Sequence, residues 1–362
     1  CDYLCDGTND QEEIIQALEA LPTGGEVVIL DGTYNITASI NIPKDNVSIR
    51  GNSNATTLKR MYNSTRTNSG ATARGLITLN EKSGCKIQGL QIDGNKAIYT
   101  ASYNYGIYLD SSSNNTITDN TCNNNSNIGI WLSSSSNNTI TGNTCNNNSY
   151  GIYLDSSSDN TVTGNTYNNN HDDGILLYSS NNNTVTDNTC NNNNYGIYLY
   201  LSSNNNTVTG NTCNNNSYGI FLYSSSNNTV TGNTCNNNSN SGIRLYSSNN
   251  DTVTGNTCNN NNSYGIYLYS KSSNNTVTGN TCNNSSSGIC LDSSNNNNTV
   301  TGNTCNNDNS GIYLSSSSNN TVTGNNCNNN NYGIRLLSSS NNNTVTGNTC
   351  IRGTGQTSDY AS

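Results

Sequence analysis

One sequence unit of 22 to 24 residues recurs eleven times between Thr116 and Cys350. A period of this length is typical of a solenoid, in which each unit stacks on copies of itself. The spacing is set by one slot per copy, which holds cysteine in ten copies and tyrosine in one. The slot residues are Cys122, Cys145, Tyr167, Cys190, Cys213, Cys235, Cys258, Cys282, Cys305, Cys327 and Cys350.

Each unit contains two short strand patterns and no helical one. The first is Thr-Val-Thr, as at residues 161–163, and the second is Gly-Ile-x-Leu, as at residues 151–154. Alternation at period two directs Val, Ile and Leu inward and the residues between them outward. Asn, Ser and Gly fill the connections, as they do in turns. A coil this short cannot bury its own apolar residues, so we predict an all-β parallel β-helix.

The regularity of the repeat gives the expected organisation of the chain. A short amphipathic helix, capped by Asn9 or Asp10, is expected to cover the first coil with Ile14 and Leu18 on its buried face. The expected parts are residues 1–105 (cap helix and irregular first coils), 106–350 (regular β-helix repeats) and 351–362 (C-terminal tail).

Both the repeat and the entry segment point to a known group. The segment from Cys5 to Leu18, followed by Gly24 to Tyr34, resembles the right-handed parallel β-helix proteins of the pectate-lyase-like superfamily, especially their NosD-like surface and periplasmic branch. The resemblance implies a right-handed solenoid. It implies no single function, because the fold hosts lyases, hydrolases, adhesins and inert rods alike.

Composition indicates an extracellular or cell-surface protein. The chain has fourteen cysteines, 10% charged residues and a net charge of −9. That acidity argues against nucleic acid as a partner, and no apolar run is long enough to span a membrane. We interpret Cys1 as the start of a mature chain whose signal segment has been removed. Glycosylation sequons outside the repeat occur at Asn35, Asn46, Asn54 and Asn63.

Catalytic or metal-binding residues are hard to find. No Lys or Arg lies between Lys96 and Arg244, and the acids of the repeats are scattered singly. The exception is His171 with Asp172 and Asp173, either a metal or catalytic site or, as we expect, a solvated bulge. Copper calls for Met, His or exposed thiolates, and the chain has one Met and one His. We predict no catalytic, cofactor or metal residue.

The ten repeat cysteines form either a column of buried thiols, which we favour, or rung-to-rung disulfides. The disulfide alternative pairs residues 122 with 145, 190 with 213, 235 with 258, 282 with 305 and 327 with 350. Cys290 occupies an outward slot and Cys1 lies at the terminus, so both are candidates for cross-links to another copy. Pairing of Cys1 with Cys5, or a lipid on Cys1, are the alternatives.

Aromatic residues recur at outward positions and predict two columns. They form a sugar-stacking platform, a lateral protein interface or simple rung-to-rung stacking, and we favour the interface. The middle-slot column holds Tyr108, Trp131, Tyr153, Tyr198, Phe221, Tyr267 and Tyr313, and the second holds Tyr178, Tyr200, Tyr223, Tyr246 and Tyr269.

The repeats continue to Cys350 with no helix to cover the last coil, and exposed strand edges are normally protected. We therefore predict a non-enzymatic structural protein that self-assembles, end to end and laterally, into a sheath, surface layer or filament. The alternative is a carbohydrate-binding or polysaccharide-processing β-helix protein, with cell-surface glycans as partners. A minor alternative is ice binding by the columns of threonine.

Overall fold

The computed structural model describes residues 2–66, 70–71, 73–293 and 295–351. Contacts within the chain group into two compact units, residues 1–189 and residues 190–362. This division differs from the expected organisation, which follows the regularity of the repeat and not the contacts. Cys1 and the tail beyond Ile351 lie outside the described residues.

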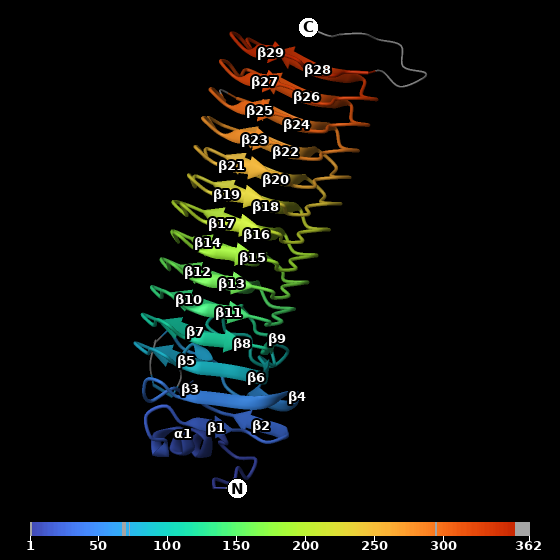
Figure 1. Ribbon diagram of the computed structural model, residues 1–362. Coiled ribbons are helices and arrows are strands. Elements are labelled where there is room, and N and C mark those ends of the chain that lie inside the picture. The colour runs from blue at the N-terminus through green and yellow to red at the C-terminus, as the bar shows by residue number, and fades with distance from the viewer. Residues whose placement is uncertain (1, 67–69, 72, 294, 352–362) are drawn as a thin grey trace. The chain divides into compact units, whose positions relative to one another are not determined.

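The first unit contains one helix and two parallel sheets (Figure 1). The helix is α1 (Gln11–Ala20). The threonine sheet is built in the pairing order β1 (Glu26–Val28), β4 (Ser48–Arg60), β6 (Lys86–Asp93), β8 (Thr116–Thr118), β11 (Thr139–Thr141), β13 (Thr161–Thr163) and β15 (Thr184–Thr186), with β2 (Gly32–Ile36) beside β4 and β9 (Thr121–Asn123) beside β6. The tyrosine sheet consists of β3 (Ile40–Asn41), β5 (Gly75–Asn80), β7 (Tyr105–Asp110), β10 (Ile128–Ser133), β12 (Tyr150–Asp155) and β14 (Asp173–Tyr178).

The second unit repeats the same two sheets without a described helix. Its threonine sheet consists of β17 (Thr207–Thr209), β19 (Thr229–Thr231), β21 (Thr252–Thr254), β23 (Thr276–Thr278), β25 (Thr299–Thr301), β27 (Thr321–Thr323) and β29 (Thr344–Thr346). Its tyrosine sheet consists of β16 (Tyr195–Tyr200), β18 (Tyr218–Tyr223), β20 (Ser241–Tyr246), β22 (Tyr264–Tyr269), β24 (Ser287–Asp292), β26 (Ser310–Ser315) and β28 (Tyr332–Leu337).

Within each unit a strand pairs in parallel with the equivalent strand one turn later. In β19 and β21, for example, Thr229 lies opposite Thr252 and Val230 lies opposite Val253. Because pairing is between equivalent residues, every residue type of the repeat becomes a column. The prediction of an all-β, right-handed parallel β-helix with a short N-terminal helix is confirmed.

The core consists of the inward residues of each turn. In the second unit Ile220, Leu222, Val230 and Cys235 are each fully buried, and their burial is the main stabilising contribution. Gly219 allows this packing, since a Cβ there would lie 2.4 Å from the carbonyl oxygen of Gly242 and 2.9 Å from the Cβ of Cys235.

Asparagine serves two different purposes in the turns. Asn137 is exposed with φ of 55°, a left-handed conformation that asparagine tolerates. Its neighbour Asn138 is buried, and its Nδ2 donates to Oδ1 of Asn160 one turn later at 3.0 Å. The backbone N–H of Asn138 donates to the same oxygen at 2.9 Å. Such ladders satisfy buried polar groups that short strands leave unpaired.

Helix α1 covers the beginning of the first unit, as predicted, with Ile14 and Leu18 buried. The N-cap is Asp10, but its side chain does not cap the helix. Its carboxylate instead accepts the backbone N–H of Gly7 at 2.8 Å and of Asn35 at 2.7 Å. Asp10 therefore fastens the N-terminal segment to β2.

Candidate functional site: two aromatic faces

Rings on the outer side of the tyrosine sheet in the first unit stack into a continuous patch, here named the first aromatic face and made of Tyr105, Tyr108, Trp131, Tyr150 and Tyr153. The rings of Tyr105, Tyr108 and Trp131 are buried, and those of Tyr150 and Tyr153 are half-buried. Tyr108 and Trp131 are register partners and stack at 4.6 Å between ring centroids. Trp131 meets Tyr105 edge-on at 4.9 Å and stacks on Tyr153 at 6.0 Å. The patch follows from pairing between equivalent residues, because parallel register places every outward ring above the next.

An arginine lies against this face. The guanidinium carbon of Arg74 is 5.1 Å from the ring centroid of Trp131 and 5.7 Å from that of Tyr108, within cation–π range. Arg74 also donates to the carbonyl oxygen of Arg66 at 3.0 Å. No carboxylate forms an ion pair with Arg74 in the described part of the chain. Its charge is therefore available to an anionic group that reaches the face.

The other end of the first aromatic face is acidic. Asp173 is the register partner of Tyr150 and is only 3% exposed. Burial, and then the neighbouring Asp172, raise the pKa of Asp173 well above its usual range. Burial and the same two carboxyls raise the pKa of Tyr150 to about 12. His171 is exposed and contacts Asp172 at 2.9 Å. A solvated bulge stays our prediction for this cluster, and of its three residues Asp173 joins the aromatic face.

The second unit carries its own patch, the second aromatic face. Tyr198 stacks on Phe221 at 5.1 Å, and Tyr223 stacks on Tyr246 at 4.7 Å. The two columns predicted here are thus close-packed rung by rung. The face comprises Tyr195, Tyr198, Tyr200, Tyr218, Phe221, Tyr223, Tyr246, Tyr264, Tyr267 and Tyr269.

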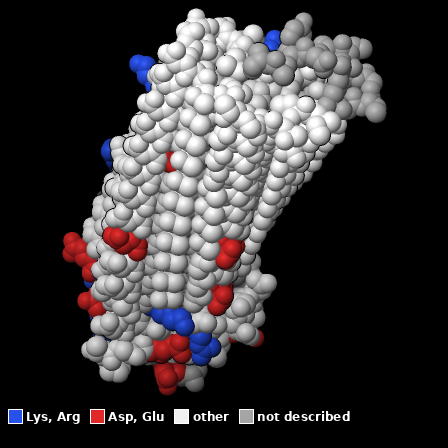
Figure 2. All heavy atoms as spheres, turned by 45° about the horizontal axis from the view of Figure 1, so that its top comes forward, with Lys and Arg blue, Asp and Glu red and all other residues white. Residues whose placement is uncertain are grey.

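Arg244 takes the place of one ring in this second face. Its guanidinium carbon lies 5.2 Å from the Phe221 ring and 5.3 Å from the Tyr267 ring. It donates to the hydroxyl of Tyr218 at 3.1 Å. Arg335 lies 4.5 Å from the Tyr332 ring in the same way. Both units thus present arginine against aromatic rings. Figure 2 shows few Lys, Arg, Asp and Glu on the side that is in view.

A third aromatic column was missed by the sequence analysis. The residue before each Gly-Ile-x-Leu pattern is often tyrosine, and strict alternation would direct it inward. In the structure Tyr195 stacks on Tyr198 at 4.7 Å, and Tyr264 stacks on Tyr267 at 4.2 Å. The strand bends at the glycine, where the register pairs skip one residue. The recurrence of tyrosine at this slot was the available signal. The column includes Tyr105, Tyr150, Tyr195, Tyr218 and Tyr264.

Not every predicted aromatic residue joins these stacks in the same way. Tyr178 ends β14 and is half-buried. Tyr313 lies between Cys290 and Arg335 in register and 5.8 Å from the Arg335 guanidinium carbon. Neither contradicts its predicted outward position.

Nine of the ten repeat cysteines are buried, and Cys350 is exposed. All ten are free thiols in the structure, and burial raises the pKa of Cys235 and Cys258 well above the usual range. The column of buried thiols that we favour, and the alternative of rung-to-rung disulfides, both stay predictions. Cys290 is in register with Tyr267 and Tyr313, but it is only 1% exposed. The inference that it presents an exposed thiol is wrong, because the large neighbouring rings cover a small side chain.

The sequons keep their status as predictions. Asn46, Asn54 and Asn63 are exposed, and Asn35 is half-buried with its Nδ2 donating to the carbonyl oxygen of Gly7 at 3.2 Å. Cys1, the other cross-link candidate, lies outside the described residues.

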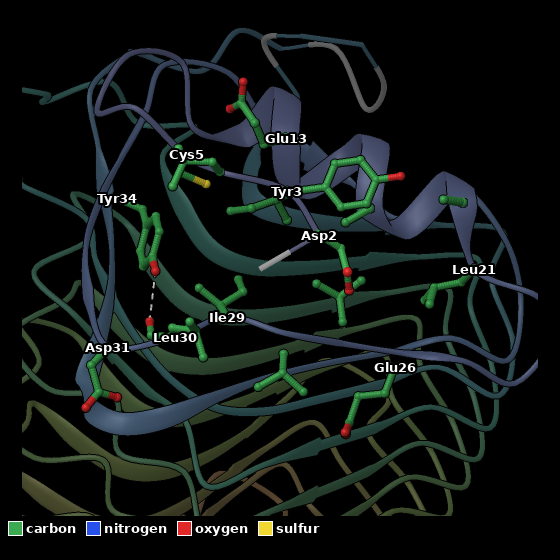
Figure 3. Close-up of a pocket in the computed structure, with 16 residues that line it drawn as sticks. Asp2, Tyr3, Cys5, Glu13, Leu21, Glu26, Ile29, Leu30, Asp31 and Tyr34 are labelled. Atoms are coloured by element: carbon green, nitrogen blue, oxygen red, sulfur yellow. Dashed lines mark hydrogen bonds between the residues drawn. The ribbon is translucent and has the colours of Figure 1, made fainter.

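A cavity of about 740 Å³ lies between the N-terminal segment, α1 and the first turn (Figure 3). Its walls include Leu4 and Leu30, and Cys5 and Glu13 face it. The sulfur of Cys5 and carboxylate oxygens of Asp10 and Glu13 lie within 4.8 Å of one another, so these residues could hold a metal ion. Burial and the neighbouring carboxylates raise the pKa of the Cys5 thiol to about 11. The Asp10 carboxylate is already engaged by two backbone N–H groups, which favours a structural role for the cluster.

Two family models match the chain. One, described as a right handed beta helix region, matches residues 75–235, and the other, described as periplasmic copper-binding protein (NosD), matches residues 216–362. No curated protein matches at a significant level. No described helix is long and apolar enough to cross a membrane.

The residues that match the second family model lack the usual ligands of the copper named in its description. Residues 216–362 contain neither His nor Met, since His171 and Met61 both precede them. Within the described part of this range Cys350 alone among the cysteines is exposed. The donor set of this region therefore does not fit copper.

Solved structures share the fold over nearly the whole chain. The A-module of mannuronan C-5 epimerase AlgE6 from Azotobacter vinelandii is 20% identical, with a TM-score of 0.75 over 96% of this chain and 97% of that one. The Dettilon tailspike protein is 18% identical, with a TM-score of 0.72 over 86% and 66%. An exopolygalacturonase from Thermotoga maritima is 11% identical, with a TM-score of 0.59 over 97% and 90%.

These similarities correct the functional prediction. A non-enzymatic structural polymer, such as a sheath, surface layer or filament, is the wrong main interpretation, because the structural neighbours include alginate epimerases, a tailspike and an exopolygalacturonase. They favour the alternative of a carbohydrate-binding or polysaccharide-processing protein, and they give no support to ice binding. The error has a physical cause, since an outward column of rings suits a sugar as well as a protein. Fold, family matches and neighbours together identify the chain as a right-handed parallel β-helix protein.

Proposed function

We propose that the protein binds an acidic polysaccharide across the first aromatic face. The observation that carries the proposal is the half-buried ring of Tyr153 and the guanidinium of Arg74, which lie against the buried rings of Trp131 and Tyr108. Aromatic rings offer apolar faces on which sugar rings pack, and an arginine without an acidic partner suits a carboxylate or sulfate. The names of structures with this fold, which include mannuronan and galacturonan enzymes, support the same class of ligand.

Binding is favoured over catalysis at this face. The carboxyl whose pKa is raised most clearly there belongs to Asp173, and it is 3% exposed. An acid that transfers a proton must come within hydrogen-bond reach of the ligand. We place the protein outside the cytoplasm, because the NosD family is described as periplasmic and the chain carries exposed sequons.

The chain supplies its own reporter for a test. Trp131 is its single tryptophan and lies in the middle of the first aromatic face. Titration with alginate or polygalacturonate should therefore change the intrinsic fluorescence, whereas a neutral glucan should change it less. Tyr153→Ala should weaken binding by about threefold to tenfold, the value of one ring contact.

Two further variants separate charge from stacking. Arg74→Gln should remove the preference for acidic over neutral polysaccharide. Thr163→Ala, on the threonine sheet of the same unit, is the control and should bind as the natural chain does. Binding that is equally strong in all three variants, or absent from every acidic polysaccharide tried, would refute the proposal.

A further inference from the structure

Two aspartates interrupt the asparagine ladders of the second unit. One ladder precedes the threonine strands, and in it Nδ2 of Asn298 donates to Oδ1 of Asn320 at 3.1 Å. The next step, from Asn320 to Asn343, has the same length of 3.1 Å. Each rung thus needs one acceptor and one donor from every side chain. The members of this ladder are Asn206, Asn228, Asp251, Asn275, Asn298, Asn320 and Asn343.

Asp251 supplies the acceptor but has no amide to supply the donor. Its Oδ1 accepts the backbone N–H of Asn228 at 2.7 Å and the Nδ2 of Asn228 at 3.2 Å. The residue is 1% exposed, and its Oδ2 is buried without a hydrogen-bond partner among the described residues. This oxygen takes the place of the amide nitrogen that donates in the other rungs. On the next rung Oδ1 of Asn275 already accepts the backbone N–H of Asp251 at 2.8 Å.

Asp308 repeats the situation in a second ladder. Its Oδ1 accepts the backbone N–H of Ser285 at 2.7 Å, and its own N–H donates to Oδ1 of Asn330 at 2.7 Å. Its Oδ2 is buried, and the part of the chain that the structure describes offers it no hydrogen-bond partner. The equivalent atoms of Asn261 and Asn330 are amide nitrogens, which donate to the carbonyl oxygens of Cys235 and Cys305 at 3.0 and 2.7 Å.

An ionised carboxylate would be costly at either place. Its second oxygen would face acceptors, and a buried charge needs a partner of opposite sign. Among the described residues, the pKa of Asp251 is shifted by burial and by hydrogen bonds from Asn228, with no contribution from a charged group. Asp308 is faced by the thiols of Cys282, Cys305 and Cys327, which are neutral. A proton is the one cation small enough to fit a gap of hydrogen-bond length.

We infer that Asp251 and Asp308 are protonated at neutral pH and act as hydrogen-bond donors where the asparagine rungs of the ladders use their amide groups. The second unit therefore has two built-in proton sites, and their contribution to its stability decreases as the pH rises toward the pKa values of the folded chain. Burial raises the pKa of both Asp251 and Asp308 to about 8, from 3.8, although hydrogen bonds to Oδ1 act in the opposite direction.

The sign of the effect follows from linkage. Below about pH 4 folded and unfolded chains both hold the protons, so the stabilisation is complete. Between about pH 4 and pH 8 only the folded chain holds them, and the equilibrium shifts toward unfolding tenfold per pH unit for each group. Above pH 8 the folded unit loses them and the ladders are broken at both places.

The test compares the full-length chain with Asp251→Asn, Asp308→Asn and the double variant. Infrared spectroscopy of the natural chain at pH 7 should show neutral carboxyl absorption that declines in each single variant. Amide exchange should show the stability of the second unit decreasing from pH 5 to pH 8 in the natural chain. The two aspartates together should contribute about a hundredfold change in the unfolding equilibrium per pH unit, and the double variant should lack this contribution. Asp159→Asn, an exposed aspartate in a similar turn, is the control and should change neither measurement.

Two spectroscopic or exchange results, and one result on folding, would overturn the inference. One is a carboxyl spectrum at pH 7 that is fully ionised or unaltered by both substitutions. The other is a double variant whose pH dependence equals that of the natural chain. If an asparagine variant failed to fold, that too would count against the inference, because an amide is the group these ladders otherwise use.

Discussion

Replacing Trp131 with alanine should loosen the first aromatic face by an amount that the structure allows to be worked out. Trp131 is 8% exposed and contacts the rings of Tyr105, Tyr108 and Tyr153. These ring pairs and the cation–π contact of Arg74 contribute together about 2 to 5 kcal/mol. That range agrees with the roughly 3 to 5 kcal/mol lost when a buried large aromatic side chain is cut to alanine.

Trp131→Phe is the matched comparison. Phenylalanine keeps a ring in the stack, and it removes the indole Nε1, which is buried without a partner among the described residues. The lost stacking area is therefore offset in part by the removal of an unsatisfied donor. We expect a cost below about 1.5 kcal/mol.

Hydrogen exchange of the amides in β10 and β12 is the suitable assay, because turns of a solenoid interact mainly with their neighbours and a global melt averages over them. Exchange in β22 of the second unit is the internal control. If Trp131→Ala lowered the free energy of opening by less than about 1 kcal/mol, the rings would be independent of one another, and the interpretation of the face as a packed stack would be refuted.

Two further predictions concern titratable groups. Asp173 has a raised pKa in the folded chain, so its contribution to stability is complete below about pH 4 and is lost as the pH rises toward the pKa of the folded chain. Asp173→Asn should therefore flatten the pH dependence of unfolding in the first unit, and a natural chain with the same thermal midpoint at pH 5 and pH 7 would contradict this. Thiol reagents should label Cys5 and Cys350 of the native chain first, and the eleven buried cysteines among those described should react only in denaturant. Mass spectrometry of peptides measures the order of labelling, and rapid labelling of Cys258 in the native chain would contradict the burial of the cysteine column.

The fold was predictable because the same two strand patterns recur in nearly every copy of the repeat. Thr-Val-Thr and Gly-Ile-x-Leu each alternate at period two, and only stacking in register buries their Val, Ile and Leu. The N-terminal helix α1 was predictable because Ile14 and Leu18 form an apolar face at helical spacing. What the pattern could not give was local backbone geometry. The bend at each glycine turns Tyr195 and Tyr264 outward against strict alternation, and the rings around Cys290 cover an outward slot.

The candidate site was predicted only in part. The middle-slot aromatic residues were identified, including Trp131, but the strand-start tyrosines and the placement of Arg74 were not. Arg74 lies far from Trp131 in sequence, in a region without repeat, and only the path of the chain brings them together. The ligand could not be chosen either, since the chemistry of an outward ring column is shared by sugars and proteins.

Pairing between equivalent residues has a consequence for how such a chain changes over evolutionary time. Strand β20 pairs with β18 and with β22 through equivalent positions of the repeat, so neighbouring turns meet through the same interface each time. Deleting or duplicating a complete 22- to 24-residue copy would rejoin surfaces that already fit. Unequal recombination within the repeats would therefore change the length of the aromatic columns in fixed increments of one turn, with the same packing at every new junction.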